Sequence, residues 1–156
     1  MKKILLVTTL DITFKYILKD QPSILGKYFS VFIGSNNYIG IKKYAKSQSV
    51  KFIHIPMIRR INPVYDIFSI YCLIKHIIKI RPHVIHSYTP KAGLICAISG
   101  FIMRVPYRLH TFTGLVFPTQ PLLLSKILSN IDSLICRINT HIIAEGMGVK
   151  KQLKDS

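Results

Sequence analysis

The sequence predicts an α/β fold built on a doubly wound parallel sheet of about six strands. The first observation is that apolar runs of strand length alternate with longer segments of helical period. The second is that no apolar run reaches the roughly 20 residues that a membrane-spanning helix needs. The third is that 156 residues with 49% hydrophobic content suffice for one domain with a real core. We therefore expect a single domain whose ligands bind beyond the carboxyl ends of the strands.

Six segments have the length and composition of strands. The first, within "MKKILLVTTLDITF", begins like a signal peptide, but Asp11 interrupts the apolar stretch and no small-residue cleavage site follows. We therefore interpret it as a strand of a cytoplasmic protein and keep a secreted protein as the minor alternative. The expected strands are residues 3–9, 28–34, 51–55, 83–87, 107–112 and 140–144.

The clearest helix is expected over residues 64–80, after Pro63 at a position suited to a first helical turn. Lys75 and Lys79 lie on its polar side. The residues at 3.6-residue spacing, which we expect to face the core, are Ile67, Ile70, Tyr71, Ile74, Ile77 and Ile78.

Two further helices are expected. One begins at Thr89, a good N-cap residue, with Pro90 in its first turn. The other covers residues 122–138, after the interruption "FPTQP". Its expected core residues are Leu123, Leu124, Ile127, Leu128, Ile131 and Leu134.

The segment "HSYTPKAGL", residues 86–94, leaves the fourth strand at its carboxyl end and enters the next helix. Free N–H groups at the helix N-terminus, together with Lys91, could hold a phosphate or a sugar hydroxyl there. An equally good interpretation is a helix start with no ligand, in which Thr89 and Pro90 serve only as cap and first residue.

Other kinds of site find little support. The six acidic residues form no close pair, which disfavours a two-carboxylate hydrolase. The histidines lack metal-ligand spacing, and Cys72, Cys96 and Cys136 lack a C-x-x-C pair. We expect no metal and no cofactor.

Charge is the strongest feature of the composition. The chain has 22 Lys and Arg against 6 Asp and Glu, a formal net charge of +16. Such a balance predicts attraction to an anion, whether nucleic acid, phospholipid headgroups or a phosphorylated substrate.

Two stretches carry a family resemblance. "HVIHSYTPKAGLICAISGFIMRVPYRLHTFTGLVF" resembles the family 4 glycosyltransferases of bacterial capsule, O-antigen and exopolysaccharide assembly, which have a similar H-x-H-T-P-K-A-G segment. "IPMIRRINPVYDIFSIYCLIKHIIKIRP" is similar to their I-P-x-x-R-x-I-x-P segment. The resemblance implies that residues 1–156 form the Rossmann-like N-terminal, acceptor-binding half of a GT-B fold. It also implies that the C-terminal donor-binding domain, with its E-x7-E motif, is absent.

The resemblance also implies site residues. His86, Thr89 and Lys91 match the family segment, while Tyr88 stands where many members have a second histidine. Gly114 matches the glycine of a family T-x-H-G turn, and Thr113 occupies its histidine position. A threonine is no general base unaided, so the catalytic residue is unknown. We expect His86, Thr89, Lys91, Thr113 and Gly114 to bind the acceptor, and His110 to be structural.

The function that the resemblance implies is transfer of a sugar from a nucleotide-sugar donor to a lipid-linked saccharide, at the inner face of the cell membrane. The acceptor half alone is then inactive. Basic residues expected to face an anionic membrane are Lys42, Lys43, Lys46, Arg59 and Arg60, with apolar contacts from Phe117 and residues 122–124.

Two alternatives stay open. The chain could be an acceptor subunit that pairs with a separate donor chain, as in split glycosyltransferases. It could also be a basic nucleic-acid-binding α/β module, although no recognisable RNA-binding signature is present and no nucleic acid is expected.

Overall fold

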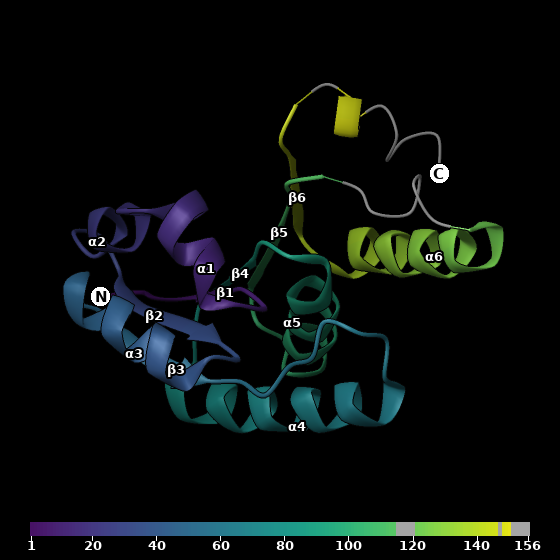
Figure 1. The fold of residues 1–156 in the computed structure, drawn as a ribbon. Coiled ribbons are helices and arrows are strands. Elements are labelled where there is room, and N and C mark those ends of the chain that lie inside the picture. Colours follow the sequence, from purple (N-terminus) through teal and green to yellow (C-terminus); the bar gives the residue numbers. More distant parts are fainter. Residues whose placement is uncertain (115–120, 147, 151–156) are drawn as a thin grey trace.

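A computed structural model describes residues 1–114, 121–146 and 148–150. Its centre is a six-stranded parallel sheet with the order β3-β2-β1-β4-β5-β6 (Figure 1). The six expected strands are all present, with ends displaced by two residues at most: β1 (Lys3–Val7), β2 (Ser30–Ser35), β3 (Lys51–His54), β4 (Val84–Ser87), β5 (Tyr107–Phe112) and β6 (His141–Ala144). The predicted α/β doubly wound class is therefore confirmed.

Helices cover both faces of the sheet (Figure 1). One face carries α1 (Asp11–Thr13), a π-helical turn η1 (Phe14–Leu18), α2 (Gln21–Leu25) and α3 (Tyr38–Ser47). The other carries α4 (Pro63–Ile80) and α5 (Pro90–Ile102), and α6 (Leu122–Ile138) packs beside α5. Because successive strand side chains point to opposite faces, Leu5 and Val7 of β1 join the core under α4 and α5, whereas Ile4 and Leu6 join the other core.

The predicted core face of α4 is only partly right, since Ile70 packs against the core beside Ile77 but three of the six residues are exposed. Of its six residues only Ile77 is fully buried, while Ile67 is 68% exposed and Tyr71 and Ile78 are also exposed. The buried face instead consists of Asp66, Ser69, Leu73, Ile77 and Ile80. The helix is apolar on nearly every side, so hydrophobic period cannot fix its rotation.

Polar contacts fix the rotation of α4. The Ser69 hydroxyl lies 2.5 Å from the Pro56 carbonyl oxygen and 2.8 Å from that of Tyr65. Asp66 bonds to Lys91 of α5. An apolar strip of α4 therefore remains on the surface.

Helix α6 also departs from its predicted core face. Leu123 is 76% exposed, and Ile127 and Leu134 are exposed as well. Leu124 and Leu128 are half-buried, Ile131 packs against the core, and Ile135, absent from the predicted set, is fully buried.

Close packing of α5 on the sheet depends on Gly93. A Cβ at this position would lie 2.5 Å from Cε1 of the buried His110 ring in β5. Any larger residue would push α5 away from the edge where its N-terminus meets the ends of β1 and β4. Strand order reverses between these two strands, which is where doubly wound sheets bind ligands.

Among the helices of the described ranges, none is both long and apolar enough to cross a bilayer.

Candidate functional site

Two threonines join the loops that follow β1 and β4. The Thr89 hydroxyl oxygen accepts a hydrogen bond from the Thr9 backbone N–H at 3.0 Å and lies 2.6 Å from the Thr9 hydroxyl. Thr89 does occupy the N-cap position of α5, with extended backbone, as predicted, but its side chain makes no capping bond to its own helix. It holds the two loops together instead.

Lys91 is paired rather than free. Its ammonium donates to both carboxylate oxygens of Asp66, at 2.8 and 2.7 Å, and the two side chains are only 10% and 11% exposed. The positive charge expected at the N-terminus of α5 is therefore balanced by a carboxylate from the first turn of α4.

A cavity of about 330 Å³, here named the Arg59 pocket, opens beside this pair. Thr9, Thr89 and Lys91 line it together with Arg59 and Leu128. Arg59, which we expected on a membrane surface, thus lies next to two of the expected acceptor-binding residues. The pocket adjoins the N-terminus of a 13-residue helix, where backbone N–H groups favour an anion.

His86 opens into a different cavity, of about 610 Å³, here named the His86 pocket. Its ring is buried and stacks on Tyr88 with 4.2 Å between centroids. The rim carries Asp20, Gln21 and Glu145. Two of the chain's six acidic residues therefore border one pocket.

The hydrogen bonds of His86 determine its tautomer. The Tyr88 hydroxyl donates to Gln21 Oε1 at 3.1 Å, so its oxygen accepts from His86 Nδ1 at 3.0 Å. Nε2 then accepts from the Thr111 hydroxyl at 2.8 Å. Burial lowers the pKa of His86 to about 4, which keeps the ring neutral.

The remaining expected site residues lie elsewhere. Thr113 and Gly114 follow β5 on the surface, and neither lines the Arg59 pocket or the His86 pocket. His110 points to the opposite face, where Nδ1 lies 2.8 Å from the Ser87 hydroxyl beneath Gly93. Burial lowers the pKa of His110 to about 4 as well. This environment is that of a structural residue.

The expected membrane-facing residues are divided between two places. Lys42, Lys43 and Lys46 lie on α3, across the sheet from α6 (Figure 1). Arg59 and Arg60 precede α4, while Phe117 lies outside the described residues.

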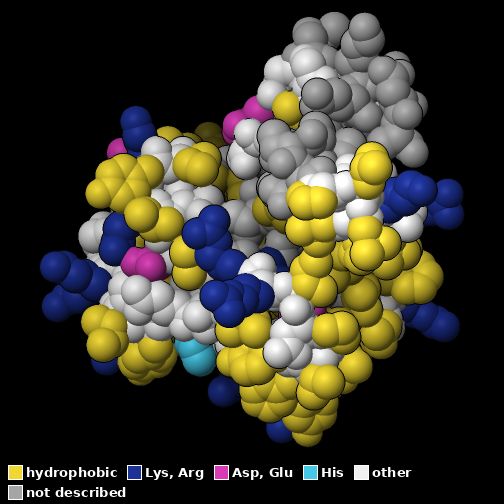
Figure 2. All heavy atoms as spheres, turned by 45° about the vertical axis from the view of Figure 1, so that its right-hand side comes forward, with side chains coloured by type: hydrophobic (Ala, Val, Ile, Leu, Met, Phe, Trp, Pro, Cys, Tyr) yellow, Lys and Arg dark blue, Asp and Glu magenta, His cyan; other side chains and the backbone are white. Residues whose placement is uncertain are grey.

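Figure 2 shows a broad hydrophobic area over α4 and α6 with Lys and Arg side chains around it. We name it the α4–α6 apolar surface, and its exposed residues are Val64, Ile67, Phe68, Tyr71, Leu122, Leu123 and Ile127.

Sequence reasoning missed Asp66, Thr9, Asp20, Gln21 and Glu145. For the carboxylates a signal was available: with only six acids among so many bases, each acid is a natural partner for a buried polar group. Thr9 and Gln21 gave no such signal. Within the described part of the chain, no group of three or more His, Cys, Asp or Glu side chains is placed to hold a metal ion.

Comparison with known proteins identifies one relative by sequence. The chain is 33% identical over 99 residues to the capsular polysaccharide biosynthesis glycosyltransferase CapM of Staphylococcus aureus. The match covers 64% of this chain and 26% of the relative. No protein-family model matches the chain.

Solved structures share the fold. HepE of Anabaena in complex with UDP superposes with a TM-score of 0.72 at 14% identity, over 98% of this chain and 40% of that one. MurG of Acinetobacter baumannii gives 0.68 at 8% identity, over 96% and 42%. The UDP-N-acetylglucosamine 2-epimerase of Rickettsia bellii gives 0.72 at 12%, over 99% and 42%.

The chain thus spans about a quarter of its sequence relative and about two fifths of these structures. At such low identities the structural matches establish the fold alone. Together with the capsular relative, they confirm the resemblance indicated by the sequence motifs: the chain is glycosyltransferase-like in sequence and has the Rossmann-like fold found in GT-B enzymes.

Proposed function

We propose that this chain is the acceptor-binding domain of a glycosyltransferase that transfers a sugar from a nucleotide-sugar donor to a lipid-linked saccharide in surface-polysaccharide assembly. The observation that carries the proposal is the 33% identity to a capsular glycosyltransferase. The fold cannot carry it, because the UDP-N-acetylglucosamine 2-epimerase of Rickettsia bellii superposes as well as HepE does. No feature of the two pockets favours epimerisation over transfer.

In this proposal, the nucleotide-sugar donor binds to a part of the enzyme outside these residues. HepE was solved with UDP and with UDP and glucose, and this chain matches only about two fifths of it. The chain alone then binds acceptor but transfers nothing. A split enzyme, whose donor half is a separate chain, predicts the same behaviour together with a co-purifying partner.

The two pockets suit different parts of a lipid-linked saccharide. The His86 pocket offers amide and carboxylate groups that bind sugar hydroxyls, supplied by Gln21, Asp20 and Glu145. The Arg59 pocket offers a guanidinium and a helix N-terminus, which suit a phosphate. Thr113 and Gly114, exposed at the same edge of the sheet, would meet the acceptor from outside the pockets.

The α4–α6 apolar surface suits the lipid part and the membrane that holds it. Apolar side chains next to Arg59 and Arg60 are suited to contact the headgroup layer at the inner face of the membrane. Each Lys or Arg near an anionic membrane surface contributes about 1 kcal/mol to the free energy of binding. In this proposal the membrane lies beside the Arg59 pocket, within reach of a lipid diphosphate.

Titration with a short-chain prenyl-diphosphate monosaccharide tests the acceptor role. We expect saturable binding that Arg59→Gln weakens about fivefold or more and that Lys27→Gln leaves unchanged, because Lys27 is an exposed lysine that lines neither pocket. Saturable binding of UDP without binding of the prenyl-diphosphate sugar would contradict the acceptor role. Sugar transfer by the purified chain would contradict the inactivity of this half.

Vesicle co-sedimentation tests the membrane role. Phe68→Ser should weaken binding to vesicles containing phosphatidylglycerol about tenfold, while Tyr28→Ser should not, because Tyr28 is a more exposed aromatic residue between α2 and β2 and lies outside the α4–α6 apolar surface. Equal losses for both variants would refute the assignment. Tighter binding to RNA than to vesicles, with a steep salt dependence, would favour the nucleic-acid alternative.

A further inference from the structure

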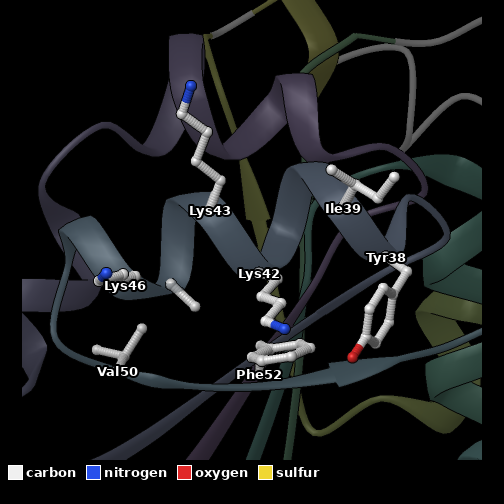
Figure 3. A pocket seen from close by; sticks show the side chains of 8 residues that line it. Tyr38, Ile39, Lys42, Lys43, Lys46, Val50 and Phe52 are labelled. Carbon is white, nitrogen blue, oxygen red and sulfur yellow. The ribbon is translucent and has the colours of Figure 1, made fainter.

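A hollow of about 630 Å³ lies between α3 and the edge strand β3, and it shares no lining residue with the two pockets of the candidate site. We name it the α3–β3 groove. Its floor is apolar, formed by Ala45, Val50 and Phe52, with Tyr38 and Ile39 at one end (Figure 3).

Lysines border this apolar floor. Figure 3 shows Lys42 reaching from α3 toward Phe52 and Tyr38, Lys46 lying at the end near Val50, and Lys43 directed away from β3. The Lys42 ammonium is 5.8 Å from the centroid of the Tyr38 ring. In the described chain the two ion pairs are Lys15–Asp11 and Lys91–Asp66, so neither Lys42 nor Lys46 is engaged by a carboxylate there.

The basic and apolar character continues around the edge of the sheet. A second hollow, of about 940 Å³, shares Tyr38, Val50 and Phe52 with the groove and adds Lys51 and Lys79. No Asp or Glu of the described residues lines either hollow. An occupant must therefore combine an anionic group with an aliphatic part.

Addition of a peptide strand to β3 fits this edge poorly. The Val50 N–H already donates to the Ala45 carbonyl oxygen at 3.1 Å. His76 Nε2 lies 3.2 Å from the His54 carbonyl oxygen, so this outward-facing acceptor is occupied as well. A four-residue strand with these groups engaged offers little backbone for pairing.

We propose that the α3–β3 groove binds one anionic phospholipid, with its phosphate between Lys42 and Lys46 and an acyl chain along Val50 and Phe52. Lysine suits this role because its aliphatic stem covers apolar surface while its ammonium reaches the phosphate. The site is separate from the acceptor pockets, and it accounts for Lys42 and Lys46 without requiring these residues to lie in one membrane plane with α6.

The test is calorimetric titration of the purified chain with dihexanoyl phosphatidylglycerol below its aggregation concentration. Dihexanoyl phosphatidylcholine and glycerol phosphate are titrated in parallel. We expect saturable binding of the phosphatidylglycerol, at least tenfold weaker binding of the zwitterionic lipid, and no binding of glycerol phosphate. Equal binding of both lipids, or tight binding of glycerol phosphate alone, would overturn the proposal.

Variants locate the site. Neutralising both lysines in Lys42→Gln/Lys46→Gln should weaken phosphatidylglycerol binding about 25-fold, whereas Lys27→Gln should change it less than twofold. Val50→Thr keeps the side-chain shape while adding a hydroxyl to the floor, and it should weaken binding of the lipid. Retained binding in the double variant would refute the proposal whatever the acceptor titration shows, since Arg59 and the α4–α6 apolar surface are intact in it.

Discussion

Replacing Lys91 by Met tests whether the ion pair to Asp66 holds α4 and α5 together. With nitrogen–oxygen distances of 2.7 and 2.8 Å, two unit charges attract by about 6 kcal/mol at an effective dielectric constant of about 20. Desolvation of the two nearly buried groups offsets much of this attraction. A carboxylate left without its partner costs more than the intact pair contributes, so we expect a loss of about 3–5 kcal/mol.

The loss is measured by urea unfolding followed by far-ultraviolet circular dichroism. Lys15→Met is the control: Lys15 pairs with Asp11 at 2.6 Å, its side chain is 43% exposed, and Asp11, itself only 9% exposed, keeps the hydrogen bond from Asn37 Nδ2 at 3.0 Å. It should therefore cost about 1 kcal/mol or less. The double variant Lys91→Met/Asp66→Leu replaces the pair by apolar groups and should recover most of the loss.

Equal and small effects of Lys91→Met and Lys15→Met would refute the reasoning. They would mean that Asp66 finds other partners and that Lys91 can leave the pair to bind a phosphate. A large loss that the double variant restores would instead make Lys91 a structural residue at the rim of the Arg59 pocket.

Three further outcomes are expected from equilibrium unfolding. Gly93→Ala should cost about 1–3 kcal/mol, because its Cβ would lie 2.5 Å from the His110 ring. Gly114→Ala, whose Cβ would meet no atom of the described residues within 4 Å, should change stability by less than about 0.5 kcal/mol. Stability should fall as pH drops from 6.5 toward about 4, because the unfolded chain then protonates His86 and His110 while the folded chain does not. Each histidine contributes up to about 3 kcal/mol. Burial raises the pKa of Asp132 to about 6, which opposes them, so His86→Gln should make the fall shallower. Thr89→Val should cost about 1–3 kcal/mol and Thr89→Ser should restore it, since the bond to the β1 loop needs only a hydroxyl; equal losses in both would contradict that role.

The sheet could be predicted from the sequence because its signals are local. Short apolar runs bounded by polar turns mark strands, and each of the six lies within two residues of its expected ends. The rotation of α4 could not be predicted in the same way. Its sequence is apolar on two faces, and hydrophobicity alone does not determine which of them is buried. One face contains Leu73 and Ile77, and the other contains Ile67, Tyr71 and Ile78. The choice between them depends on Asp66 and Lys91, which are 25 residues apart in the chain.

The same limit applies to the site. Sequence spacing predicted that His86, Thr89 and Lys91 lie at one edge of the sheet. It did not predict on which side of the loop after β4 each side chain lies. Thr89 and Lys91 line the Arg59 pocket, whereas His86 points to the other face. Residues 86 and 91 are separated by a strand end and a helix start, so alternation along the strand and the helical turn together set their directions.

The chain has too few carboxylates to neutralise its basic side chains. With 6 acidic residues, at least 16 of the 22 Lys and Arg side chains have no carboxylate of their own. Two acids, Asp11 and Asp66, are used in ion pairs, and Asp20 and Glu145 border the His86 pocket. Balancing charge must therefore come from outside the chain at the basic surfaces. The α3–β3 groove joins unbalanced lysines to an apolar floor, which is why a lipid anion fits this groove better than a soluble phosphate does.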